Sequence, residues 1–266
     1  MRILIVGGGI GGVTAALCLA KDGHDVEVFE QSDVYTDTGA GVQLSPNCTR
    51  VLHYLGLENA LRTSAFRPEG LEFRNWKSGK TITTSALGEA VIAKFGFPYY
   101  HIQRGDLIHL LVKAAAKHAN IRLHTKSKVG GFSEAFSSIK ISVNNLKHQG
   151  DLLIGADGIH SAIRPILWGD EKPSFTGNVA WRALVPASEL PKGMVRPMAT
   201  VWWGPGRHFV HYYIKRGELV NCVCVVEKEG WEVESWTERG DYDELKADFS
   251  GWNEDVQTLI DFADRN

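Results

Sequence analysis

The fold of this chain is decided by residues 2–12, which read RILIVGGGIGG. The apolar, β-branched run at 2–6 predicts a buried parallel strand, and the glycines that follow predict a tight turn. Apolar residues then recur through 10–22 and Gly23 ends the pattern, so we expect a helix there. The segment DVEVF at 25–29 predicts another strand. Together these segments indicate one βαβ unit at the start of the chain.

The glycines of this turn follow the pattern Gly7-x-Gly9-x-x-Gly12, and Glu30 stands 18 residues after Gly12, at the end of the second strand. Gly7 allows the tight turn, Gly9 lets the backbone approach a pyrophosphate, and Gly12 permits close packing of helix and strand. The N–H groups at the helix N-terminus would bind the phosphates. Glu30 would accept hydrogen bonds from a ribose and would repel a 2′-phosphate. The pattern therefore predicts a site for FAD or NAD rather than NADP.

The composition restricts the class of protein. A chain of 266 residues with 44% hydrophobic residues is large enough for one sizeable domain or two smaller ones. A formal net charge of −2 gives no electrostatic basis for binding nucleic acid or an anionic membrane surface. Residues 3–20 carry no charge, as in a signal peptide or short membrane span, but five glycines split this run into a strand and a helix. We expect a cytoplasmic protein that acts on a small molecule.

A second strand–turn–helix and a different kind of sheet follow. Residues 151–156 read as a buried strand, Asp157-Gly158 as a turn and 159–168 as a helix. From residue 172 onward, short segments rich in Trp, Tyr, Val and Thr alternate with Gly/Pro turns, which is typical of an antiparallel sheet. Its expected strands are 179–186, 198–203, 208–215 and 219–226, joined by a hairpin of 71–76 and 80–84. We therefore predict an α/β fold, with a Rossmann-like domain around a parallel sheet and a second, mostly antiparallel β-sheet domain.

Three segments carry a resemblance to a known family: Gly7–Gly12 with Glu30, QRGDL at 103–107, and GADGIHSAIR at 155–164. With these, the sequence resembles the FAD-dependent aromatic-ring monooxygenases. That group includes salicylate hydroxylase and 6-hydroxynicotinate monooxygenase, which share the para-hydroxybenzoate hydroxylase fold. Two further stretches, GAGVQLSPN at 39–47 and WWGPGRH at 202–208, are similar to the salicylate hydroxylase branch.

The resemblance implies FAD as the cofactor. Arg104 would lie beside the ribityl and pyrophosphate portion of FAD, and Asp157 would reach the flavin-binding core from its strand–helix turn. On the residues alone, Arg104 fits a surface ion pair with Asp106 equally well, and Asp157 fits a helix cap. The further positions that the resemblance assigns to FAD are Gly41, Val42 and Val129.

The resemblance also implies the chemistry, in which NADH or NADPH reduces the flavin and O₂ then hydroxylates a small, salicylate-like aromatic acid. On the expected strand 208–215, His208 and Tyr212 share one face and match positions that face the substrate in the family. Gln43 matches a pocket position that is histidine in the hydroxynicotinate enzymes. We expect these three residues to be catalytic, with opposite-face residues such as His211 as the alternative. His208 and His211 point apart on a strand, so we expect no metal site.

The resemblance implies an FAD-binding domain made of 1–65 and 102–170, and a substrate domain made of 66–101 and 171–266. Family members continue beyond this length, into a later Gly-Asp motif and helix that complete the flavin site. Three hypotheses therefore compete: a monooxygenase, a truncated and catalytically incomplete FAD-binding module, and a plain Rossmann protein that binds NAD. The Asp157-Gly158 turn argues against the third. The sequence does not indicate the oligomeric state.

Overall fold

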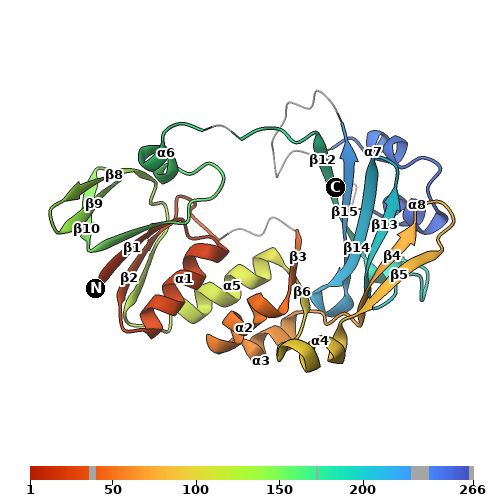
Figure 1. Ribbon diagram of the computed structural model, residues 1–266, viewed down its shortest axis with the longest axis horizontal. Coiled ribbons are helices and arrows are strands. Elements are labelled where there is room, and N and C mark those ends of the chain that lie inside the picture. Colours follow the sequence, from red (N-terminus) through yellow and green to blue (C-terminus); the bar gives the residue numbers. More distant parts are fainter. Residues whose placement is uncertain (36–39, 172, 229–239, 264–266) are drawn as a thin grey trace. The chain divides into compact units, whose positions relative to one another are not determined.

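The computed structural model describes residues 1–35, 40–171, 173–228 and 240–263 (Figure 1). Contacts divide the chain into two compact units, Met1–Thr36 with Gly105–Ser174 and Asp37–Arg104 with Phe175–Asn266. Residues 37–65, expected in the FAD-binding domain, belong by their contacts to the second unit. The assignment of these stretches to an FAD-binding and a substrate-binding domain stays a prediction.

The first unit is built on a parallel sheet of four strands, in the order β11-β1-β2-β7. Helix α1 follows β1 directly and packs against β2, which gives the expected βαβ unit (Figure 1). Helix α5 precedes β7 in the chain. The bounds are β1 Arg2–Val6, α1 Ile10–Lys21, β2 Asp25–Phe29, α5 Arg104–Ala115, β7 Ile121–His124 and β11 Leu152–Gly155.

A second, antiparallel sheet in this unit has the strand order β10-β9-β8. Its strands are β8 Val129–Ala135, β9 Ser138–Val143 and β10 Leu146–Gly150. Side chains of this sheet, of the parallel sheet and of helix α6 (Ile163–Trp168) share one apolar cluster. The buried members are Leu4, Val6, Phe29, Val129, Ile141, Val143 and Ile163.

The expected helix over 159–168 was wrong at its start, because α6 begins only at Ile163. The Asp157 carboxylate explains the late start. Its Oδ1 accepts a hydrogen bond from Ser161 Oγ at 2.7 Å, and its Oδ2 accepts from the backbone N–H groups of Ala162 and Ile163 at 2.7 and 3.2 Å. These bonds satisfy the first amides of the helix and hold residues 158–161 in a turn.

The second unit is built on a six-stranded sheet with the order β12-β15-β14-β13-β4-β5. All neighbouring pairs are antiparallel except β13 with β4, so the prediction of a mostly antiparallel sheet is confirmed. Short 3₁₀ turns, η1 Ala187–Glu189 and η2 Lys215–Gly217, follow β12 and β14. The strands are β4 Gly70–Asn75, β5 Thr81–Ala86, β12 Asn178–Pro186, β13 Met198–Gly204, β14 Arg207–Ile214 and β15 Leu219–Glu227.

One face of this sheet packs against helices α7 (Tyr242–Asp248) and α8 (Glu254–Asp261), seen beside the strands in Figure 1. The second unit also holds a two-stranded antiparallel sheet, β3 with β6. The remaining elements are β3 Gly41–Leu44, α2 Pro46–Tyr54, α3 Glu58–Ser64, α4 Gly88–Phe95 and β6 Tyr100–Gln103. In the described part of the chain, no helix combines the length and apolar character needed to cross a membrane.

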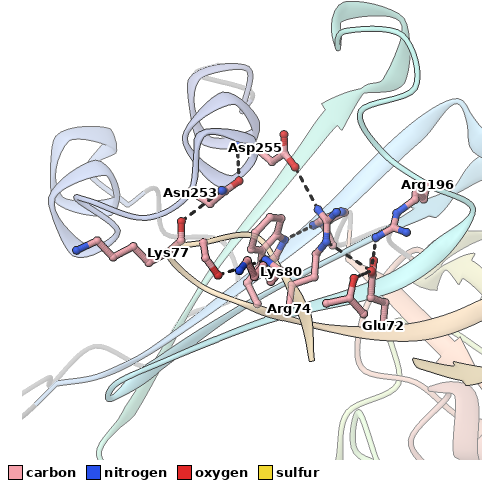
Figure 2. A network of polar contacts seen from close by, with 11 residues as sticks. Glu72, Arg74, Lys77, Lys80, Arg196, Asn253 and Asp255 are labelled. Carbon is pink, nitrogen blue, oxygen red and sulfur yellow. Dashed lines mark hydrogen bonds and ion pairs between the residues drawn. The ribbon is translucent and has the colours of Figure 1, made fainter. Parts of the chain in front are cut away.

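An ionic network around the buried Glu72 joins β4 to α8 (Figure 2). Glu72 has no exposed surface; its Oε1 accepts a hydrogen bond from Thr81 Oγ1 at 2.6 Å and pairs with the guanidinium of Arg196. Arg74 Nε lies 3.5 Å from the same oxygen, and Arg74 Nη1 lies 3.1 Å from Asp255 Oδ2. The two guanidiniums balance the two carboxylates, so the charge of the buried Glu72 is compensated by partners that lie partly at the surface.

Candidate cofactor and substrate site

The glycine turn after β1 is closed so tightly that only glycine fits at two positions. Gly7 has φ +103°, and a Cβ there would lie 2.3 Å from the carbonyl oxygen of Ala156. A Cβ on Gly12 would lie 1.9 Å from the carbonyl oxygen of Gly7. Both distances are far inside van der Waals contact, so side chains at these positions would force the turn, β11 and the start of α1 apart.

The N-terminus of α1 leaves room for an anion. Its N-cap is Gly9, which makes no side-chain cap, and its first turn contains no acidic residue. A Cβ on Gly9 would meet nothing within 4 Å, so the space in front of this turn is open on that side. The first amides of a helix have no partner within the helix and carry its positive dipole end. The turn therefore fits a pyrophosphate group.

Glu30 lies at this turn as expected. One carboxylate oxygen accepts a hydrogen bond from the Gly8 N–H at 2.7 Å, and the other accepts from the Ser32 N–H at 2.9 Å. These bonds fix the carboxylate against the glycine turn. A carboxylate oxygen can accept more than one hydrogen bond, so Glu30 keeps acceptor capacity for the hydroxyls of a ribose.

Asp157 also meets the glycine turn, through its backbone. Its Cα lies 2.8 Å from where a Gly7 Cβ would stand. Its side chain is engaged at the start of α6, which is the capping role that the sequence alone allowed. The side chain of Val129 is buried in the apolar cluster of the first unit, and Val129 stands opposite Val143 in the β8–β9 pair.

The remaining expected FAD positions come together in the second unit. Gly41 and Val42 pair with Gln103 and Ile102 in the β3–β6 sheet. Arg104 follows directly, and its N–H donates to the carbonyl oxygen of Ala40 at 2.8 Å. Residues about 60 positions apart in the sequence thus form one short backbone ladder.

Strand β14 divides its side chains between two environments, as its alternation predicts. Phe209 lies in the core beneath α7 and α8, with its ring 5.6 Å from that of Phe249. His211, on the same side, is buried and accepts a hydrogen bond from Trp202 Nε1 at 3.2 Å. Tyr212 belongs instead to a separate cluster with Ala199 and Ile214.

The face that carries Tyr212 combines apolar and polar groups. In the strand register His208 stands beside Trp203. Arg182 pairs with Val223, which pairs with Val210, and Val210 points to the same side of β14 as His208 and Tyr212. Trp203 is 55% exposed. We call this surface the open face. Flat aromatic and aliphatic side chains with a few polar groups suit a small aromatic ligand.

Burial sets the protonation of the two candidates on the open face. It lowers the pKa of His208, so the imidazole is neutral near pH 7. It raises the pKa of Tyr212 far above the usual range, although Arg182 opposes this shift, so the phenol keeps its proton. Gln43, on β3, is exposed and its Oε1 accepts a hydrogen bond from Tyr99 Oη at 2.7 Å.

Comparison with known protein families agrees with a cofactor site at the glycine turn. A family model described as an FAD binding domain matches residues 1–246. The chain belongs to the FAD-binding domain family. The prediction that FAD is the cofactor is thereby confirmed.

Curated relatives of this FAD-binding domain chain are aromatic-acid monooxygenases. It is 37% identical to 3-amino-4-hydroxybenzoate 2-monooxygenase PtnB3 of Streptomyces platensis, over 99% of this chain and 66% of the relative. It is 32% identical to 6-hydroxynicotinate 3-monooxygenase of Pseudomonas fluorescens, over 98% of this chain and 68% of the relative. The chain therefore spans about two thirds of the length of these relatives.

Solved structures confirm the fold of this family member. Klebsiella pneumoniae HpxO, complexed with FAD and uric acid, superposes with a TM-score of 0.82 at 24% identity, covering 98% of this chain and 65% of HpxO. A salicylate hydroxylase substrate complex gives 0.78 at 22% identity, covering 99% of this chain and 66% of that structure. The predicted α/β architecture is therefore confirmed.

Sequence reasoning missed two residues that adjoin Tyr212. His101 on β6 is buried, with its ring centroid 4.4 Å from that of Tyr212. Asn221 on β15 is buried and stands beside Tyr212 in the strand register. Only their polar character inside otherwise apolar segments could have marked them. Among the residues that the structure describes, no group of three or more His, Cys, Asp or Glu side chains is placed to hold a metal ion.

Proposed function

We propose that this chain is the FAD-binding and substrate-binding part of a monooxygenase that hydroxylates a small aromatic acid, similar to salicylate, with NADH or NADPH and O₂. The observation that carries the proposal is the glycine turn with Glu30, in a chain that matches the FAD-binding domain family over residues 1–246. The names of the relatives support an aromatic acid as substrate.

In this proposal the first unit holds the adenosine diphosphate half of FAD. Gly7, Gly9 and Gly12 admit the pyrophosphate to the N-terminus of α1, and Glu30 accepts hydrogen bonds from the ribose. When bound, FAD supplies the redox and oxygen-transfer chemistry. The further residues assigned to it are Gly41, Val42, Arg104, Val129 and Asp157.

The open face would orient the aromatic acid. Tyr212 keeps its proton and would donate a hydrogen bond to a carboxylate or phenolate oxygen. The neutral His208 would accept the proton of a phenolic hydroxyl as that ring becomes electron-rich. Gln43 carries an amide, which orients a substrate without exchanging protons. His208 is therefore our candidate base and Tyr212 our candidate anchor.

A second candidate function is an FAD-binding module without catalysis of its own. It requires only the glycine turn and Glu30 at the junction of β1 and α1. The two functions differ in one observable: both predict bound FAD, but only the first predicts consumption of NADH or NADPH that depends on an aromatic acid.

The test is oxidation of NADH or NADPH by FAD-loaded protein, with hydroxylated product measured by mass spectrometry. Salicylate, 6-hydroxynicotinate and 3-amino-4-hydroxybenzoate are the probes. We expect at least one to stimulate oxidation and to gain one oxygen atom. Tyr212→Phe should raise KM roughly tenfold, because a hydrogen bond to a charged group is lost, whereas His208→Asn should lower kcat more than it raises KM.

His118→Asn, on the first unit, is the matched control and should leave both parameters unchanged. FAD-loaded protein that no aromatic acid stimulates would leave the binding module as the function. If an aromatic acid stimulates oxidation but KM and kcat are unchanged in both variants, the open face does not bind the substrate.

A further inference from the structure

Asn221 is a buried polar residue in a face that is otherwise apolar at its centre. It lies on β15, pairs with Tyr212 in the register of β14 and β15, and is 2% exposed. Its neighbours on β15 at the same spacing are Leu219 and Val223. An aliphatic residue would fill this position without a desolvation penalty, so the amide needs another reason.

The amide makes one long-range hydrogen bond. Asn221 Oδ1 accepts from the N–H of Gly41 at 2.8 Å, between residues 180 positions apart in the sequence. Its Nδ2 is buried and has no hydrogen-bond partner in the described part of the chain. The desolvation cost of a buried unpaired donor offsets the stabilisation that the single hydrogen bond provides. The residue thus contributes little net stability, and its effect is on position.

Asn221 and Tyr212 both pack closely against the backbone of Gly41. A Cβ on Gly41 would lie 2.8 Å from Asn221 Cγ and 3.0 Å from both Cε2 and Oη of Tyr212. The absence of a side chain therefore lets the backbone of β3 lie directly against these two residues. Tyr212 in turn contacts the ring of His101 on β6, the strand that pairs with β3. The start of β3 is held from β15, β14 and β6 together.

We propose that Asn221 is a positioning residue, which holds the Gly41–Val42 backbone against Tyr212 in the conformation that receives the flavin. The inference rests on the proposed function, since it takes Gly41 and Val42 as flavin contacts. Through Gly41 the same amide links the cofactor segment to the open face. A change at Asn221 should therefore weaken FAD binding through the lost hydrogen bond to the Gly41 N–H.

The test combines hydrogen exchange with FAD titration on the folded chain. Asn221→Leu keeps the volume but removes the acceptor, whereas Asn221→Asp keeps an acceptor oxygen. We expect Asn221→Leu to speed exchange of the Gly41 and Val42 amides at least tenfold and to raise the Kd for FAD roughly tenfold. Asn221→Asp should keep exchange of the Gly41 amide slower than in Asn221→Leu, because a carboxyl oxygen can still accept its hydrogen bond. Asn178→Leu, on neighbouring strand β12, is the matched control and should change neither.

Each outcome decides a separate part of the proposal. Unchanged exchange at Gly41 in Asn221→Leu overturns the positioning role. Faster exchange with an unchanged Kd overturns the link to the cofactor. Wild-type protein that binds no FAD overturns the proposed function itself, and with it the cofactor half of this inference, while the exchange data still decide the contact. Should Asn221→Leu not fold, Asn221→Ala removes the same acceptor without added bulk and is expected to give the same two changes.

Discussion

Replacing Gly12 by alanine is expected to abolish retention of FAD and to destabilise the first unit. The added Cβ would stand 1.9 Å from the Gly7 carbonyl oxygen, a backbone atom that moves only if the turn opens. Overpacking of this kind typically costs about 1–3 kcal/mol, occasionally more. Because the same turn is the proposed pyrophosphate site, we expect the Kd for FAD to rise roughly 100-fold. Titration with FAD and thermal unfolding measure the two effects.

Gly11→Ala is the matched control for this prediction. Gly11 lies next to Gly12 in α1, and a Cβ there would meet nothing within 4 Å. Alanine also has the higher helix propensity, so this variant should be at least as stable as the wild type and should bind FAD normally. Equal FAD affinity in the two variants would contradict the role assigned to the glycine turn.

Replacing Glu72 by alanine is expected to lower the free energy of unfolding by about 1–3 kcal/mol, because a buried carboxylate and its charged hydrogen bonds to partly exposed guanidiniums are lost. Two guanidiniums, those of Arg74 and Arg196, would lose their shared carboxylate (Figure 2). Arg74 also lies over the ring of buried Trp202, so its displacement would disturb the core beneath α8. The measurement is urea-induced unfolding at neutral pH.

Glu69→Ala, one residue before β4, is the control, because Glu69 is exposed. It should change the free energy of unfolding by less than about 0.5 kcal/mol. A loss of similar size in both variants would show that the network does not stabilise the second unit. Glu72 lies on the face of the sheet turned away from Tyr212, so folded Glu72→Ala protein should retain its affinity for FAD.

Local patterns allowed much of the fold to be predicted. The strand, glycine turn and helix of the first βαβ unit follow from apolar spacing within 30 residues, and the structure places Gly7, Gly12 and Glu30 at one turn. The alternation of β14 likewise separates Tyr212 from Phe209. The βαβ unit and the alternation of β14 both follow from the spacing of apolar residues close together in the sequence, which is what periodicity can predict.

Contacts between distant residues could not be predicted in this way. The sequence gives no sign that Gly41 meets Asn221, or that Glu72 meets Arg196, because register and pairing across a sheet depend on the whole fold. The pairing of β3 with β6 also joins distant residues, and the sequence did not predict it. By their contacts, residues 37–65 belong to the second unit. The late start of α6 depends on the rotamer of Asp157, which no helical pattern encodes.

The central claim is that this chain binds FAD at the turn between β1 and α1. The most direct test is the visible absorption spectrum of the purified chain after it has been loaded with FAD and freed of the excess. The account predicts a retained and shifted flavin spectrum in wild-type protein and in Gly11→Ala, and its loss in Gly12→Ala. Folded wild-type protein that remains colourless after loading would contradict the claim.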